Sequence, residues 1–213
     1  MDARAHWQNV YQTRQPDEVS WYRPHLETSL ALIESAAPDR GARVIDVGGG
    51  ASTLVDDLTS LGYREVAVLD VSSAALDIAK DRLGANRAAS IDWLCGDVTS
   101  LSLPTHRYDL WHDRAVFHFL TRPAERAAYV RQVLHATKPG GRVIVATFAP
   151  NGPQKCSGLD VARYDPDALH AALGSAFRLE RQLADAHRTP AGAIQAFTVC
   201  DFRIVRTEGQ AAS

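Results

Sequence analysis

The chain has 213 residues, of which 46% are hydrophobic, and a formal net charge of -2. This length and composition suit one folded α/β domain and exclude an intrinsically disordered chain. The near-neutral charge provides no basic field of the kind that holds nucleic acid by its phosphates, so we expect no nucleic-acid partner.

The cysteine pattern and the N-terminus indicate a compartment. Cys95, Cys156 and Cys200 are far apart and show no Cys-x-x-Cys spacing, so we expect reduced thiols. The sequence begins Met-Asp-Ala-Arg-Ala-His, without the apolar segment of a signal peptide, and its longest apolar runs are of strand length. We therefore expect a cytoplasmic protein, a monomer or a homodimer, with no membrane partner.

Helix and strand signals then follow in chain order. Residues 3–14 and 25–37 are expected to be helical, with an ordered loop between them because Pro16 to Pro24 contains prolines and an aromatic pair. Apolar and β-branched runs predict strands at 43–47, 65–70, 90–94, 108–111 and 142–148. Helical spacing of leucine, valine and alanine follows Thr53, Ser72 with Ser73, and Thr121 with Pro123. This alternation predicts a parallel sheet with a covering helix on each crossover.

The pattern changes after Pro150. Asp165-Pro166 is expected to begin a short helix that Gly174 ends. Residues 177–184 and 194–205 are expected to form two strands joined by a loop at 187–192, and such close strands should pair antiparallel. Residues 207–213 are expected to be a flexible tail.

The stretch Val44-Ile-Asp-Val-Gly-Gly-Gly-Ala-Ser-Thr53 is a glycine turn between a strand and a helix. The fingerprint of NAD sites is G-x-G-x-x-G, but Thr53 stands where its third glycine should be, and no Gly-Lys-Ser/Thr of a P-loop follows. A lone glycine turn can also serve only close packing of strand and helix. Further polar residues stand at the carboxyl ends of the other expected strands, where ligands bind in open α/β sheets. They are Asp46, Asp70, Asp97 and the pair His112-Asp113.

With these motifs the sequence resembles the class I methyltransferases that depend on S-adenosylmethionine (SAM), over most of residues 40–150. The matching segments are Val44-Ile-Asp-Val-Gly-Gly-Gly, Val68-Leu-Asp-Val-Ser, Cys95-Gly-Asp-Val and Lys138-Pro-Gly-Gly-Arg-Val-Ile-Val145. One departure is Ser52, where the family often has a further glycine; a serine there can also cap the following helix.

The resemblance implies a Rossmann-like, doubly wound α/β fold. Its sheet should have seven mostly parallel strands with an antiparallel last strand, helices on both faces and an N-terminal helical cap. We expect a single domain over residues 1–206. It would comprise a cap at 1–38, a SAM-binding core at 40–150, and acceptor-side loops and terminal strands at 151–206.

The resemblance also implies the cofactor, SAM, and its contacts. The backbone at Gly48 and Gly50 should approach the methionine and ribose portion, Asp70 should accept hydrogen bonds from the ribose hydroxyls, and Asp97 should bind the adenine amino group. Asp70 could instead cap the next helix, and Asp97 could be only a turn residue. The other expected cofactor contacts are Trp21, Asp46, Val71, Gly96, Val98 and His112.

The acceptor is expected between the loops after the fourth and fifth strands and the N-terminal cap. His112 is the first candidate for a general base, with Asp113 and His118 as further catalytic candidates, although His118 could equally be a core histidine. Candidate acceptor contacts are Tyr22, Arg23, Arg114, Cys156 and His187. The histidines lack the spacing of a zinc site, so we expect no metal.

Three functions compete at this stage. The first is methyl transfer from SAM to a small-molecule nucleophile, a thiol, a hydroxyl or a carboxylate. The second is protein lysine methylation, since Trp7, Tyr11 and Ser20-Trp21-Tyr22 resemble the N-terminal signature of small lysine methyltransferases. The third is a regulatory domain that binds SAM or NAD without catalysis.

Overall fold

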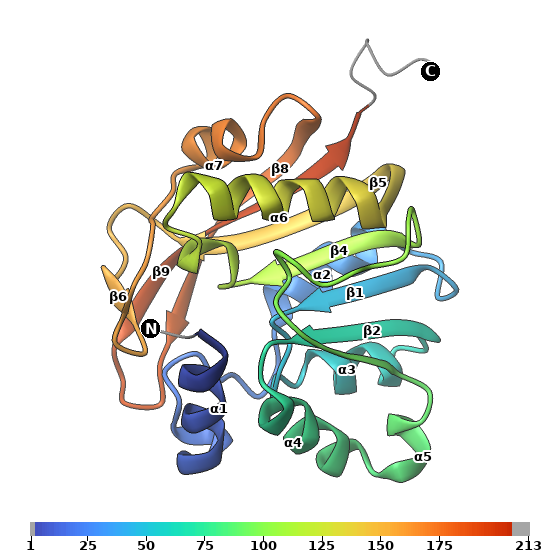
Figure 1. Ribbon diagram of the computed structural model, residues 1–213, viewed down its shortest axis with the longest axis vertical. Coiled ribbons are helices and arrows are strands. Elements are labelled where there is room, and N and C mark those ends of the chain that lie inside the picture. Colours follow the sequence, from blue (N-terminus) through green and yellow to red (C-terminus); the bar gives the residue numbers. More distant parts are fainter. Residues whose placement is uncertain (1–2, 206–213) are drawn as a thin grey trace.

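The computed structural model describes residues 3–205, which form a seven-stranded sheet covered by helices on both faces (Figure 1). The strand order is β3-β2-β1-β4-β5-β9-β8. The sheet strands are β1 (Arg43–Val47), β2 (Glu65–Asp70), β3 (Asp92–Cys95), β4 (Tyr108–Arg114), β5 (Thr137–Phe148), β8 (Phe177–Arg188) and β9 (Ile194–Ile204). The helices are α1 (Ala3–Thr13), η1 (Pro16–Glu18), α2 (Glu27–Ala36), α3 (Leu54–Ser60), α4 (Ser73–Leu83), α5 (Ala85–Ala88), η2 (Phe117–Phe119), α6 (Pro123–Ala136) and α7 (Pro166–Leu173).

The strand directions confirm the expected doubly wound fold. Strands β1 to β5 pair parallel with one another, whereas β9 pairs antiparallel with both β5 and β8. The order reverses between β1 and β4, which places the ligand-binding crevice of such a sheet beside the carboxyl end of β1. A separate two-stranded hairpin, β6 (Lys155–Cys156) and β7 (Leu159–Asp160), follows β5 and has no counterpart among the expected elements.

Alternating residues of the central strands supply two hydrophobic cores. Val44 of β1 packs with α2, α3 and α4 on one face, while Ile45 packs with α6 and α7 on the other. Strand β2 follows the same rule with Val66 and Val68 against Ala67 and Leu69. Because both faces are covered, these strands read as continuous apolar runs.

Strands β4 and β8 extend further than expected, and this changes the place of three candidate residues, His112, Asp113 and His187. Strand β4 continues to Arg114, in parallel register with β5, so His112 and Asp113 lie within the sheet rather than in the loop after it. Strand β8 continues to Arg188 because its pairing with β9 is unbroken to the turn, so His187 is a strand residue. The expected tail at 207–213 lies outside the described residues.

At the start of α3 the first helical amide is bonded by Ser52, as the sequence allowed, and not by Thr53. The Thr53 side chain makes no capping bond; instead, the Leu54 amide donates to Ser52 Oγ at 3.2 Å. The hydroxyl of Thr53 donates to the Arg23 carbonyl at 3.2 Å, which fastens the N-terminal segment to this turn. Ser72 caps α4 as expected, accepting from the Ala75 amide at 3.2 Å.

The turn after β1 requires glycine at its first position. Gly48 has a φ of +69°, and its amide donates to the Leu69 carbonyl at 2.7 Å. A Cβ atom at Gly48 would lie only 2.0 Å from Cγ2 of Val116. Both the backbone conformation and the close approach therefore exclude a side chain here.

We predict that Gly48→Ala lowers the free energy of unfolding by about 2 kcal/mol or more, since it combines an unfavourable φ with overpacking. Gly62→Ala is the matched control, because Gly62 also has a positive φ, +89°, but a Cβ there would meet nothing within 4 Å. Urea unfolding of both variants measures the difference. Equal losses of unfolding free energy in the two variants would show that the close approach of Val116 adds nothing to the cost at Gly48.

Candidate active site

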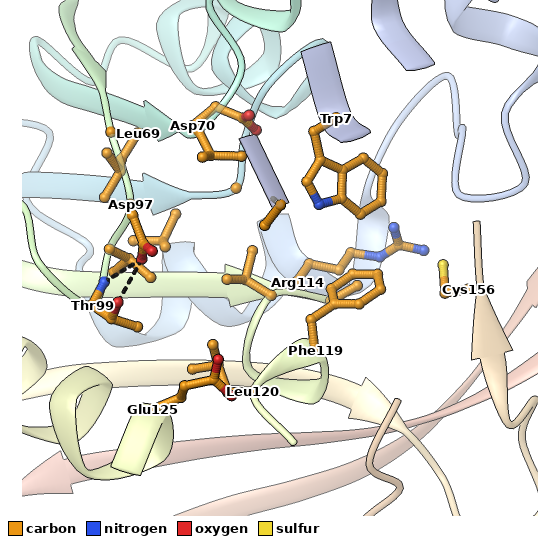
Figure 2. Close-up of a pocket in the computed structure, with 18 of the residues that line it drawn as sticks. Trp7, Leu69, Asp70, Asp97, Thr99, Arg114, Phe119, Leu120, Glu125 and Cys156 are labelled. Atoms are coloured by element: carbon orange, nitrogen blue, oxygen red, sulfur yellow. Dashed lines mark hydrogen bonds between the residues drawn. The ribbon is translucent and has the colours of Figure 1, made fainter. Parts of the chain in front are cut away.

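A cavity of about 220 Å³ opens at the carboxyl ends of β1, β2, β3 and β4 (Figure 2). The predicted site residues that line it are Trp21, Gly48, Asp70, Val71, Gly96, Asp97, Val98, Arg114 and Cys156. A smaller hollow of about 50 Å³ shares Trp21, Gly48 and Arg114 with the cavity. Further predicted residues line this hollow, namely Tyr22, Arg23, Asp46 and His112.

Asp70 ends β2 and is a buried carboxylate on the cavity wall. Its Oδ1 accepts a hydrogen bond from the Ser72 amide at 2.8 Å. Burial raises the pKa of Asp70 to about 7, and the nearby charge of Asp46 acts in the same direction, while backbone amides at Ser72 and Val71 oppose the rise. A group that donates hydrogen bonds to this carboxylate would therefore favour its ionised form.

Asp97 follows β3 and is more exposed. Its Oδ1 accepts from the amide of Thr99 at 2.8 Å and from the Thr99 hydroxyl at 2.7 Å (Figure 2). These bonds form the local turn that was the alternative reading of this residue. The side chain nevertheless lines the cavity beside Gly96 and Val98, so the turn places it there.

Gly50 lies where the glycine turn passes the Asp70 carboxylate. Its φ is +41°, and a Cβ atom there would lie 2.7 Å from Asp70 Oδ2. Gly50 itself does not line the cavity; its bare backbone leaves room for the Asp70 side chain.

Aromatic rings from α1, the following loop and η2 form one wall of the cavity. Trp7 lies edge-on to Trp21 at 5.5 Å and to Phe119 at 5.2 Å between ring centroids, and the Trp21 indole donates to the Tyr11 hydroxyl at 3.2 Å. Trp7 itself lines the cavity. The Trp-x-x-x-Tyr spacing was the signal that could have placed both rings there.

This wall is fastened to α4. Gln8 Oε1 accepts hydrogen bonds from the Ser72 hydroxyl at 3.0 Å and from the Ala74 amide at 3.3 Å. Gln8 was absent from the expected site residues because nothing in the sequence relates it to a segment more than sixty residues away. Sequence reasoning likewise missed Phe119 and Glu125, which line the cavity from the segment after β4.

His112 is buried, and both of its ring nitrogens have partners. Nδ1 is hydrogen-bonded to Asp46 Oδ1 at 2.7 Å, and Nε2 is hydrogen-bonded to the Ser29 hydroxyl at 2.9 Å. The imidazole therefore links β4 to β1 and to α2. His112 lines the smaller hollow and not the cavity, and its expected role as a general base stays a prediction.

Asp113 is also committed to the local structure. It accepts hydrogen bonds from the Tyr129 hydroxyl at 2.6 Å, the Val116 amide at 2.8 Å and the Phe117 amide at 3.0 Å. Burial raises the pKa of Asp113 to about 6, against the effect of these donors. Asp113 thus shapes the segment that carries the cavity residues Val116 and Phe119, without lining the cavity itself.

His118 and His187 are buried away from the cavity wall. The Phe148 amide donates to His118 Nδ1 at 3.4 Å, and burial, aided by the charge of Arg114, lowers the pKa of His118 to about 3. His187 Nε2 donates to the Ser20 carbonyl at 2.7 Å, and its Nδ1 accepts from Arg23 Nε at 2.9 Å. His187 therefore holds the loop that bears Arg23 rather than an acceptor.

No group of three or more histidine, cysteine, aspartate or glutamate side chains within residues 3–205 is arranged to hold a metal ion. No helix in the same range is both long and apolar enough to cross a membrane.

Comparison with known proteins shows which proteins this chain resembles. Residues 44–141 match the methyltransferase domain family. A curated relative, the ubiquinone/menaquinone biosynthesis C-methyltransferase UbiE of Ruegeria sp. (strain TM1040), is 32% identical over 130 residues, which are 59% of this chain and 51% of that protein. The chain thus spans about half the length of this relative.

Solved structures share the fold. One, from work on the conversion of a disulfide bond into a thioacetal group during echinomycin biosynthesis, has a TM-score of 0.73 at 18% identity and covers 95% of this chain and 92% of its own. Another, the Burkholderia thailandensis 1,6-didemethyltoxoflavin-N1-methyltransferase with bound 1,6-didemethyltoxoflavin and S-adenosylhomocysteine, has a TM-score of 0.70 at 19% identity and covers 95% of this chain and 87% of its own. At these identities the likeness concerns the fold alone. The family match over residues 44–141 and the doubly wound sheet are both those expected of a class I SAM-dependent methyltransferase.

Proposed function

We propose that this chain transfers a methyl group from SAM to a small-molecule nucleophile, a thiol, a hydroxyl or a carboxylate, and releases S-adenosylhomocysteine. One observation carries the proposal. The glycine turn after β1 and the buried Asp70 carboxylate meet at one cavity, beside a wall of aromatic rings. The related methyltransferases support the same class of reaction.

The residues of the cavity fit SAM in shape and in chemistry. Gly48 lines the cavity with bare backbone, which suits close approach of the methionine portion. When ionised, the Asp70 carboxylate can only accept hydrogen bonds, and the two hydroxyls of a ribose can donate them. Val71, Gly96, Asp97 and Val98 would surround the adenine, as the family resemblance implies.

SAM supplies a methyl group that its sulfonium already activates, so the chain contributes binding, alignment and exclusion of water. The rings of Trp7, Tyr11 and Trp21 close one side of the cavity and keep water from it. Their π faces also favour a positive charge nearby. Asp70 holds the nucleoside end, which fixes the distance between the methyl group and the aromatic wall.

We also propose that His112 is a positioning residue. Its contact with Asp46 fixes the carboxylate beside the glycine turn, and Asp46 lines the hollow next to the cavity. Asp113 and His118 would likewise act by shaping the segment after β4. Tyr22 and Arg23 line the smaller hollow and are proposed to close the acceptor side from the N-terminal loop.

Lysine methylation is less well supported by the charges of the site. The acceptor end of the cavity contains the Arg114 guanidinium, which repels an approaching lysine ammonium group. A binding domain without catalysis would retain the glycine turn and Asp70, so a direct assay must separate it from an enzyme.

Methyl transfer is tested with SAM labelled on its methyl group and a panel of small thiols, phenols, carboxylic acids and a cell-lysate protein fraction. We expect label in small-molecule products. Label in protein alone would support lysine methylation, and SAM binding without any transfer would support the regulatory domain. Asp70→Ala is the inactive control.

The raised pKa of Asp70 predicts pH-dependent cofactor binding. The ionised carboxylate accepts hydrogen bonds from the ribose, so affinity should be constant well above pH 7 and fall below it, by up to about tenfold per pH unit, as the free protein takes up a proton. Calorimetry with S-adenosylhomocysteine between pH 5.5 and 8 measures this. In Asp70→Asn, affinity should be lower and should lose this dependence. A wild-type affinity that stays constant across the range would remove Asp70 from the ribose contact.

The positioning role of His112 predicts that its removal lowers both cofactor affinity and turnover. His112→Leu removes a buried, charge-assisted hydrogen bond to Asp46, so affinity for S-adenosylhomocysteine and turnover should both fall about tenfold or more. Ser29→Ala removes only the other ring contact and should have a smaller effect on both. A fall in turnover with unchanged affinity would instead support His112 as a general base.

A further inference from the structure

We propose that the acceptor is a flat aromatic carboxylate and that Arg114 binds its carboxylate group. This inference rests on the proposed function, because it names the substrate class of the same cavity. It is carried by the surroundings of Arg114, which ends β4 and reaches the part of the cavity away from Asp97 (Figure 2).

Arg114 has an unused hydrogen-bond donor. Nη1 donates to the Trp21 carbonyl at 3.3 Å, and the guanidinium lies over the ring of Phe197, 4.8 Å from its centroid. Nη2 is shielded from solvent and has no hydrogen-bond partner among residues 3–205. A buried donor on a charged group is costly to leave unpaired, and a ligand that accepts a hydrogen bond there removes this cost.

The charge of Arg114 is not neutralised by a carboxylate in direct contact within the described part of the chain. Asp185 pairs with Arg23 at 3.5 Å, and Asp46 bonds to His112, so both act on Arg114 only from a distance. Burial lowers the pKa of Arg114 to about 10, and the charge of Arg23 adds to this effect. The guanidinium therefore remains positive at neutral pH and is complementary to an anion.

The walls beside Arg114 are aromatic. Trp7 and Phe119 lie next to its side chain in Figure 2, and Trp21 packs against Trp7. Aromatic rings on a cavity wall can stack or pack edge-on with a flat, conjugated ligand, and they make fewer such contacts with a saturated ligand of equal size.

This end of the cavity offers a cation but no effective general base. Burial raises the pKa of the Cys156 thiol to about 11 and raises the pKa of Tyr11 further above its usual value. The Glu125 carboxylate is bonded to Arg122 at 2.6 Å, which lowers its pKa. A phenol or a thiol would need such a base to become an anion, whereas a carboxylic acid is already ionised in water at pH 7. The carboxylate is therefore the anion that fits.

The test uses calorimetry on the protein saturated with S-adenosylhomocysteine, with 2-naphthoate and its neutral analogue 2-naphthamide as probes. We expect 2-naphthoate to bind about tenfold more tightly than 2-naphthamide, and more tightly than the saturated decahydro-2-naphthoate. Equal affinity for naphthoate and naphthamide, or no binding of naphthoate, would overturn the proposal. Equal affinity for 2-naphthoate and decahydro-2-naphthoate would overturn the proposal that the acceptor is aromatic.

Two variants assign the preference to Arg114. Arg114→Gln should abolish the preference for naphthoate, while Arg107→Gln should keep it. Arg107 does not line the cavity and pairs with Asp92, the first residue of β3, at 2.7 Å. A preference that survives Arg114→Gln would overturn the assignment. Methyl transfer from labelled SAM and binding of S-adenosylhomocysteine are measured first, so failure of the proposed function appears in those steps and failure of the carboxylate proposal in the next.

Discussion

Two carboxylates and a stretch of bare backbone share the space at the end of β1. A Cβ at Gly49 would lie 2.5 Å from Asp46 Oδ2, and one at Gly50 would lie 2.7 Å from Asp70 Oδ2. The acids of β1 and β2 can therefore be buried here only because the turn between strand and helix has no side chains. The cost of burying two like charges is partly offset by donors from elsewhere, His112 for Asp46 and the Ser72 amide for Asp70.

These donors connect the part of the cavity beside Asp70 to the rest of the fold. His112 brings β4 and, through Ser29, helix α2 into the network that surrounds the glycine turn. Asp113, the next residue, points to the other face of the sheet and orders the segment after β4 through Tyr129 of α6. Adjacent residues of one strand thus stabilise the two sides of the site, as the alternation of a strand requires.

Much of this arrangement follows from local sequence signals. Apolar runs, capping residues and the glycine turn predicted the order of strands and helices and placed Asp70 and Asp97 at one edge of the sheet. The side-chain partners were beyond such reasoning, because they depend on residues distant in the chain. No signal in the sequence relates His112 to Ser29, or shows that Nη2 of Arg114 has no hydrogen-bond partner among residues 3–205.

Residues 3–25 have an attachment at each side of the sheet. Gln8 joins helix α1 to α4, which packs on β2 and β3, while the side chain of Arg23 joins the following loop to His187 of the outermost strand β8. The aromatic rings of Trp7, Tyr11 and Trp21, which line the cavity, lie in the chain between Gln8 and Arg23 or next to them, so these two contacts hold that wall in place. A chain shortened by these residues would lose both hydrogen-bonded attachments together, and the cavity residues at the ends of β1 and β2 would be exposed to water.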